Sequence, residues 1–247
     1  MFMEIGSIEL KWLGHSSFLI NVRNALVHND GISDHPKNLL KNTQSFFGNS
    51  KNIYIDPCNI PFAIASEKAD IMLITHSHHD HCSIKDMQSI VKDGTIIVCP
   101  ANVQSKIGKL NKKIDIKILE PWQELELEGI KIKAVPAYNI NKKFHEKAEQ
   151  WNGYIIELDG NRVYHAGDTD LIPEMSNLGK IDVALLPVGG GYTMNAQEAA
   201  RATIFIKPRI AIPMHYGTII GSIEDALRFV ELCEQEGIKA EVLKVEE

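Results

Sequence analysis

Residues 76–81 form the segment that most constrains this chain, because they hold four histidines and an aspartate in the order HSHHDH. They follow the apolar run 71–74, which has the composition of a buried strand. That strand delivers the motif to its own carboxyl end, ahead of a helical pattern that starts near Ile84. Imidazoles and a carboxylate packed so densely lose solvation on burial and repel one another on protonation, and a divalent cation relieves both problems. The segment therefore predicts a metal site.

Alternation along the motif predicts how its side chains divide. His76 and His78 are two residues apart in an extended segment and so point the same way, whereas Asp80 and His81 lie past the turn and can face a second metal. His79 is expected to point elsewhere. A solvent-exposed, polyhistidine-like turn is the alternative, but HxHxDH directly after an apolar strand is far more specific than a lone histidine.

Three other apolar runs end on residues that can bind or orient a metal. The run 162–165 leads into a Gly-Asp turn that places Asp168 at a sheet edge, where its carboxylate can bridge two metals. Another run ends at His215, which completes a second metal site, and an earlier one ends at Asp56. Each alone is also typical of ordinary turn chemistry. Together with the histidine motif they indicate one site.

The fold class follows from the order of strand and helix patterns. Short β-branched runs predict strands at residues 8–13, 17–22, 52–55, 71–75, 95–99, 114–119, 130–135, 154–158, 162–165, 183–188 and 210–214. Helical patterns cover residues 84–91, 195–206 and 222–236, and Asn195 with Glu198 makes a capping box for the second. The early strands form a meander, and βα alternation is confined to the motif and the last third. We therefore expect an α/β protein, an αββα sandwich with two sheets covered by helices.

One domain spanning residues 1–247 is the better expectation for this length. The segment 28–51 departs from the regular pattern, being rich in Asn, Ser, Lys and Gly. It predicts an inserted loop or lid, with a plain surface loop as the alternative. Because it interrupts the first strands just ahead of Asp56, we expect it to border the active site.

Composition narrows the classes of partner. A net charge of −6 argues against broad attraction to a nucleic-acid backbone. It does not exclude a small anionic substrate, because a local metal centre can outweigh the global charge. The N-terminus has neither a basic leader nor an apolar run long enough to span a membrane, so a cytoplasmic location is expected. Four scattered cysteines indicate reduced thiols rather than disulfides. The sequence leaves open whether the chain forms a homo-oligomer.

Taken together, these segments resemble the metallo-β-lactamase-fold hydrolases, particularly their compact branch of ascorbate-phosphate lactonase-like and uncharacterised metal-dependent hydrolases. The similarity runs from the LGHSSF segment at 13–18 to the PMHYG segment at 213–217. It implies an αββα fold with the site at the sandwich edge. By this resemblance, His76 and His78 bind a first metal, and Asp80, His81 and His215 bind a second. Asp168 bridges the two metals. Asp56 binds neither metal but accepts hydrogen bonds that orient the ligand imidazoles.

One further ligand is ambiguous. The superfamily usually supplies a third histidine to the first metal, and His145 is the only histidine between residues 82 and 164. We favour it over Asn139, the competing position, and over a role as a surface histidine. His15 is expected at the pocket, as a substrate contact or behind a ligand, with a purely structural role as the alternative. His165 is expected to be a strand residue rather than a ligand.

The donor set suits two Zn²⁺ ions, with manganese, iron or nickel admissible on ligand chemistry. A shared water of lowered pKa is the expected nucleophile, and Asp80 is the candidate catalytic residue that accepts or shuttles its proton. Small-molecule ester, lactone and phosphodiester bonds all fit this chemistry. A nuclease of the tRNA-processing type and a non-catalytic metal-binding sensor domain are the alternatives.

Overall fold

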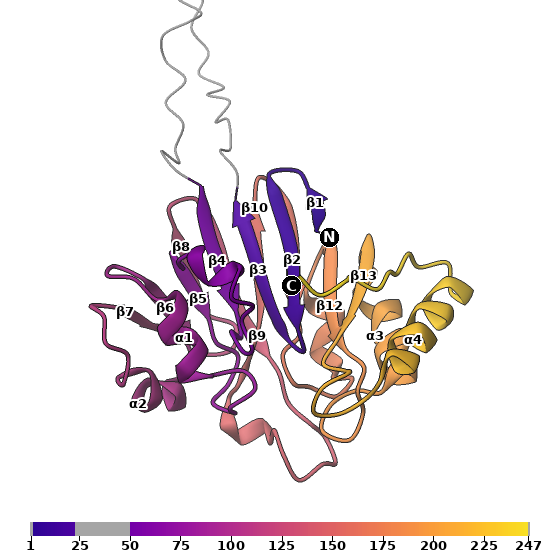
Figure 1. Cartoon of the computed structure of the whole chain (residues 1–247). Coiled ribbons are helices and arrows are strands. Elements are labelled where there is room, and N and C mark those ends of the chain that lie inside the picture. The colour runs from indigo at the N-terminus through magenta and orange to yellow at the C-terminus, as the bar shows by residue number, and fades with distance from the viewer. Residues whose placement is uncertain (1, 23–49, 247) are drawn as a thin grey trace, which may run out of the picture.

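Two sheets form the centre of the computed structural model, which describes residues 2–22 and 50–246 (Figure 1). The first sheet has the strand order β1-β2-β3-β4-β5-β6-β7, with bounds Met3–Ile5, Ile8–Gly14, Ser17–Val22, Lys51–Ile55, Ile71–Leu73, Ile96–Cys99 and Asp115–Ile118. The second has the order β13-β12-β11-β10-β9-β8. In chain order from β8 its bounds are Glu124–Leu127, Ile130–Pro136, Asn152–Leu158, Asn161–His165, Val183–Pro187 and Ile210–Met214.

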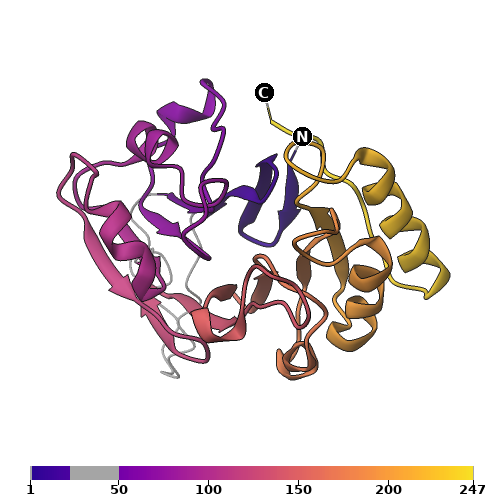
Figure 2. The same ribbon diagram turned by 90° about the horizontal axis from the view of Figure 1, so that it is seen from below.

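Helices cover the outer faces of both sheets. The α-helices are α1 (Ile84–Ile90), α2 (Gln104–Ile107), α3 (Ala196–Ile206) and α4 (Ile223–Gln235). Short 3₁₀ turns lie at Ile64–Ser66, Ala101–Val103, Lys147–Glu149 and Pro173–Asn177. Figures 1 and 2 show α1 and α2 outside the first sheet and α3 and α4 outside the second. The predicted αββα sandwich is confirmed.

Alternation within the strands explains how one sheet can be buried on both faces. In β4, Ile53 and Ile55 belong to the core between the sheets, whereas Tyr54 belongs to the layer that packs against α1. In β5, Leu73 faces the first of these cores and Met72 the second. Successive side chains of a strand point to opposite faces, so a strand covered on both sides needs an uninterrupted apolar run. Full burial of each such side chain stabilises the fold by about 1.5–3 kcal/mol.

Parallel pairing brings the functional segments to one edge. β4, β5 and β6 are parallel neighbours in the first sheet, and β11, β12 and β13 are parallel neighbours in the second. Asp56, the histidine motif, Asp168 and His215 each follow the carboxyl end of one of these strands. Figure 2 views the molecule from the side toward which β4 runs in Figure 1. The arrangement confirms the strand-then-turn reasoning made from the sequence.

The helix boundaries follow their capping signals. The Asn195 side chain accepts a hydrogen bond of 2.9 Å from the backbone N–H of Glu198, and the Glu198 carboxylate accepts one of 2.9 Å from the backbone N–H of Asn195. This confirms the predicted capping box of α3. The short strands β1 and β8 were not among the predicted strands.

Most of the predicted insertion, residues 28–49, lies outside the described residues. The described residues that flank the gap, Val22 and Ser50, adjoin the register pair Val22–Lys51 of β3 and β4, whereas Asp56 follows the opposite end of β4, where Phe18 pairs with Ile55. The reason given for placing the insertion beside the active site is therefore wrong, because it enters and leaves the sheet at the far end from Asp56. In residues 2–22 and 50–246, none of the helices has the length and apolar character of a membrane span.

Candidate metal centre

Three imidazoles form a first cluster of ligand atoms at the sandwich edge. His76 Nε2 lies 3.1 Å from His78 Nδ1, and His145 Nε2 lies 3.2 Å from the same atom. His76 and His78 come from the loop after β5, whereas His145 comes from the loop between β9 and β10. Their ligand atoms lie within 4.8 Å of one another, so one ion could contact all three. We call His76, His78 and His145 the first subsite.

A second cluster combines a carboxylate with imidazoles. The ligand atoms of Asp80, His81, His215 and His15 also lie within 4.8 Å of one another. His81 Nε2 is 3.4 Å and His215 Nε2 is 3.9 Å from Asp80 Oδ2. We call Asp80, His81 and His215 the second subsite. His15 stands behind it, because its Nε2 lies 3.0 Å from Asp80 Oδ2 and its Nδ1 lies 3.0 Å from the Thr218 hydroxyl.

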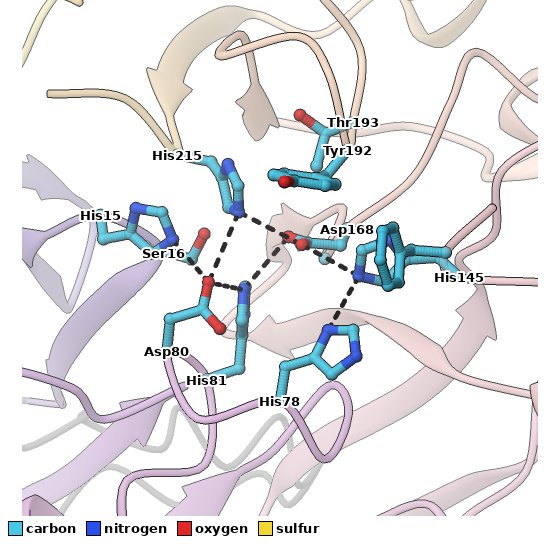
Figure 3. A network of polar contacts seen from close by, with 12 residues as sticks. His15, Ser16, His78, Asp80, His81, His145, Asp168, Tyr192, Thr193 and His215 are labelled. Carbon is cyan, nitrogen blue, oxygen red and sulfur yellow. Dashed lines mark hydrogen bonds and ion pairs between the residues drawn. The ribbon is translucent and has the colours of Figure 1, made fainter. Parts of the chain in front are cut away.

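Asp168 lies between the two subsites. Its Oδ2 is 3.2 Å from His145 Nε2 of the first subsite and 3.2 Å from His215 Nε2 of the second, while its Oδ1 is 3.3 Å from His81 Nε2 (Figure 3). Asp168 is 4% exposed, and its carboxylate oxygens approach ligand atoms of both clusters directly. This is the position that a bridging ligand requires.

A buried hydrogen-bond chain orients imidazoles in both subsites. Asp56 accepts hydrogen bonds from the Thr75 backbone N–H (2.8 Å), the Thr75 hydroxyl (2.6 Å) and His81 Nδ1 (2.7 Å). Because the Thr75 hydroxyl donates to Asp56, it accepts from His76 Nδ1 at 2.9 Å. Both histidines then carry a proton on Nδ1 and direct Nε2 toward the cluster. Such outer partners fix the tautomer and the ring orientation of metal-binding histidines.

Several buried polar atoms of the cluster find no hydrogen-bond partner among the described residues. They are His81 Nε2, Asp168 Oδ1 and both ring nitrogens of His215. Leaving a buried polar atom unsatisfied costs about 1–3 kcal/mol, more for a charged one. A cation accepted by these atoms would remove that cost, and nitrogen and oxygen donors without thiolate are the ligands that divalent zinc or its neighbours accept. The residues present therefore fit a metal.

Burial and neighbouring imidazoles keep His76 and His78 neutral. Burial and the nearby His81 hold the pKa of His76 well below the ordinary imidazole value. Burial and the nearby His145 lower the pKa of His78 in the same direction. A neutral imidazole is the form that binds a metal, so these two residues need not lose a proton near neutral pH.

In the second subsite, neighbouring charges instead favour the protonated form of His81. Burial disfavours charge on both His81 and Asp168, yet their mutual attraction prevails. The carboxylates of Asp168 and Asp56 raise the pKa of His81 well above its ordinary value. His215 and His81 hold the pKa of Asp168 well below the usual carboxyl range. An ion that binds His81 Nε2 must therefore displace a proton.

Left-handed backbone conformations cluster at the site. φ is +50° at His15, +45° at Asp56, +62° at His145 and +59° at His215. Residues other than glycine rarely adopt this region, and each instance costs about 1–3 kcal/mol unless the surrounding structure enforces it. His215 shows one such constraint, because its backbone N–H donates to the His15 carbonyl at 2.9 Å.

Three further residues considered from the sequence, Asn139, His79 and His165, lie outside the candidate ligand groups of the described chain. Asn139 is not in any candidate ligand group; its amide donates to the carbonyls of Phe144 and Tyr192, at 2.9 Å and 2.7 Å. His79 is exposed and outside the ligand groups, as its place in the motif predicted. His165 is a buried strand residue whose Nε2 contacts the Ser16 carbonyl at 2.9 Å.

The comparisons with known proteins agree with this geometry. Residues 9–215 match the family model of a beta-lactamase superfamily domain. A UPF0173 metal-dependent hydrolase of Pyrococcus abyssi is 33% identical over 96% of this chain and 95% of its own length. One of Thermococcus onnurineus is 40% identical over 78% of this chain and 88% of its own length.

This chain belongs to the UPF0173 metal-dependent hydrolases of the beta-lactamase superfamily. Solved structures agree with this membership. A crystal structure of a metal-dependent hydrolase from Parabacteroides distasonis has a TM-score of 0.78 and 31% identity, covering 100% of this chain and 98% of that one. A metallo hydrolase from Ignicoccus hospitalis has a TM-score of 0.73 and 27% identity, covering 97% and 96%. The resemblance to metallo-β-lactamase-fold enzymes is confirmed.

The sequence did not single out two residues that shape this UPF0173 hydrolase site. Thr75 links Asp56 to His76, and its position directly before the motif was a usable signal. Trp151 packs its ring 4.7 Å from that of His76 and 5.0 Å from that of His78, measured between centroids. Nothing in the local sequence around Trp151 indicates this contact.

Proposed function

We propose that this chain is a dinuclear hydrolase that cleaves an ester, lactone or phosphodiester bond in a small molecule. The position of Asp168 between the two subsites carries the proposal, because one carboxylate faces His145 on one side and His81 and His215 on the other. His76, His78 and His145 would hold one zinc ion and Asp80, His81 and His215 the other. The shared family with metal-dependent hydrolases of Pyrococcus and Thermococcus supports this proposal.

Bound metal supplies Lewis acidity, which lowers the pKa of water and polarises the scissile carbonyl or phosphoryl group. The protein positions the proton acceptor. Burial disfavours the charged form of Asp80, but the hydrogen bond with His15 and the nearby His81 imidazole outweigh it and lower the pKa of Asp80, so its carboxylate stays ionised and faces the pocket. Burial lowers the pKa of His15, so this residue is neutral and donates from Nε2 to Asp80.

We assign to Asp80 the role of taking the proton of the attacking water. His15 is a positioning residue in this scheme, because it contacts Asp80 rather than lining the pocket above the two subsites. The Thr218 hydroxyl, 3.0 Å from His15 Nδ1, fixes the tautomer that donates to Asp80.

Metal analysis of the purified protein combined with a substrate screen tests the proposal. The wild type should bind two equivalents of metal and hydrolyse at least one lactone, thioester or phosphodiester. His76→Ala and His81→Ala should each lose metal and activity together. His79→Ala is the matched control, because it removes an exposed histidine of the same motif and should change neither.

Metal retained at wild-type level in both His76→Ala and His81→Ala would refute the ligand assignment. A stoichiometry of one in the wild type would refute the dinuclear centre. Adding a precursor tRNA to the screen separates the small-molecule hydrolase from the nuclease alternative, since preferential cleavage of the RNA would overturn the proposed substrate class.

A further inference from the structure

The pocket above the two subsites has walls of two different kinds. Its volume is about 210 Å³. Metal-site residues line one part of it: His78, Asp80, His145, Asp168 and His215. Three large apolar side chains, Phe144, Tyr192 and Ile219, line the rest, and we call them the apolar wall.

The apolar wall is exposed, although large apolar side chains are more stable when buried. Phe144 is 43%, Tyr192 41% and Ile219 62% exposed. The rings of Phe144 and Tyr192 meet edge to face, with centroids 5.4 Å apart. In Figure 3 the Tyr192 ring lies between the His215 and His145 side chains. Exposed apolar surface beside a cluster of polar ligands is typical of a substrate pocket.

A buried amide ties together the two loops that carry the aromatic residues of this wall. The side-chain N–H groups of Asn139 donate to the Phe144 carbonyl at 2.9 Å and to the Tyr192 carbonyl at 2.7 Å. Asn139 is only 5% exposed, so the two loops that carry the aromatic rings are tied through the protein interior. The aromatic part of the wall is therefore pre-organised, and little ordering of these two loops should oppose ligand binding.

Charge on the pocket lining distinguishes among substrates. Among the described residues that line the pocket, none is Lys or Arg. Lys142 is engaged by the Asp170 carboxylate and the Thr193 carbonyl, and Lys143 lies 5.8 Å from the centroid of the Phe144 ring without lining the pocket. Recognition of a phosphate group usually relies on such cations or on a helix N-terminus. The protein lining itself therefore supplies no cation for a phosphate group, and recognition of an anion would rest on bound metal alone.

We propose that the apolar wall binds the hydrocarbon acyl group of a neutral carboxylic ester, and that this contact sets the substrate preference of the hydrolase. The inference rests on the proposed function. A dry cavity of roughly 150 Å³ accommodates benzene, so this pocket has room for an acyl group of about six carbons. A short acyl group such as acetyl leaves most of the wall without a partner.

Chain-length selectivity of the metal-loaded enzyme tests the wall. The substrates are p-nitrophenyl acetate, butyrate and hexanoate. Each methylene that is fully buried improves binding by about fourfold. Because the wall stays partly open, we expect kcat/KM for hexanoate to exceed that for acetate by at least about tenfold. Phe144→Ala and Tyr192→Ala should each reduce this ratio to about threefold or less.

Two control variants separate the apolar contact from other effects. Tyr192→Phe keeps the ring and should retain the wild-type ratio. Lys143→Ala removes the cation near Phe144 but leaves the wall, and it should retain the ratio as well. Metal content is measured for every variant, because a loss of metal would affect all substrates alike and leave the ratio unchanged.

A binding measurement tests the contact with the apolar wall independently of catalysis. Calorimetry compares acetohydroxamate with hexanohydroxamate on the metal-loaded wild type, and we expect at least about tenfold tighter binding of the longer compound. Equal affinities, or a ratio of kcat/KM that neither alanine variant changes, would overturn the inference while leaving the hydrolase intact. Preference for bis(p-nitrophenyl) phosphate over hexanoate would also overturn it. Failure to cleave any substrate counts against the proposed function, and the hydroxamates then decide on the wall.

Discussion

Asp56→Asn should weaken metal binding more at the second subsite than at the first. Asp56 is fully buried and accepts three hydrogen bonds, from the Thr75 N–H, the Thr75 hydroxyl and His81 Nδ1. An amide offers one acceptor oxygen in place of two, so at least one buried donor loses its partner. That loss should lower the free energy of unfolding by about 1–3 kcal/mol.

The larger effect should be on His81. Asp56 fixes the orientation of this imidazole, and removal of such a partner typically lowers metal affinity by about 10–100-fold. Competition between the protein and a calibrated chelator measures both subsites, and circular dichroism checks the fold. Asp182→Asn is a matched control, because Asp182 is also a buried carboxylate, 2% exposed, but it bonds the Arg162 N–H at the opposite end of the strands. Equal loss at both subsites, or none, would refute the reasoning.

Three further changes test other parts of the site. His145→Ala should lower metal affinity at the first subsite more than Asn139→Ala does; loss of metal in the Asn139 variant alone would reverse the assignment. Metal that binds the second subsite displaces a proton from His81, whose pKa is raised, so metal affinity there should rise by about tenfold per pH unit through the neutral range. Metal titrations at three pH values that give the same dissociation constant would contradict this. Gly189→Ala should destabilise the fold by about 1–3 kcal/mol in urea denaturation, because an added Cβ would lie 2.3 Å from the His215 carbonyl oxygen; an unchanged midpoint would count against that contact.

The features that the sequence predicted correctly depend on residues close together in the chain. The apolar runs predicted β3 and β13 at their observed bounds, since a short, mostly apolar run bounded by turn residues is a local signal. The histidine motif after β5 predicted which side chains share a side because alternation is a property of the extended chain. Asn195 and Glu198 likewise lie within one helical turn.

Other features depend on tertiary contacts that local patterns do not encode. The reason for expecting the insertion beside the site overlooked the direction of β4, which places Asp56 and Lys51 at opposite ends of the strand. Asn139 and His145 could not be separated from spacing alone, since the loop returns on itself and brings the Asn139 N–H to 2.7 Å from the His145 carbonyl. The contact between Phe144 and Tyr192 joins two loops that are far apart in the sequence.

The candidate ligands come from both sheets, and this has a consequence for how the protein unfolds. The motif after β5 belongs to the first sheet, whereas His145, Asp168 and His215 belong to loops of the second. An ion held by both sets would act as a cross-link, comparable to a disulfide that closes a loop of about 100 residues and stabilises by about 4–5 kcal/mol in the chain-entropy model. Chelation should therefore let the two halves of the sandwich separate more readily at this edge. A thermal melt would then report metal occupancy even before any substrate is known.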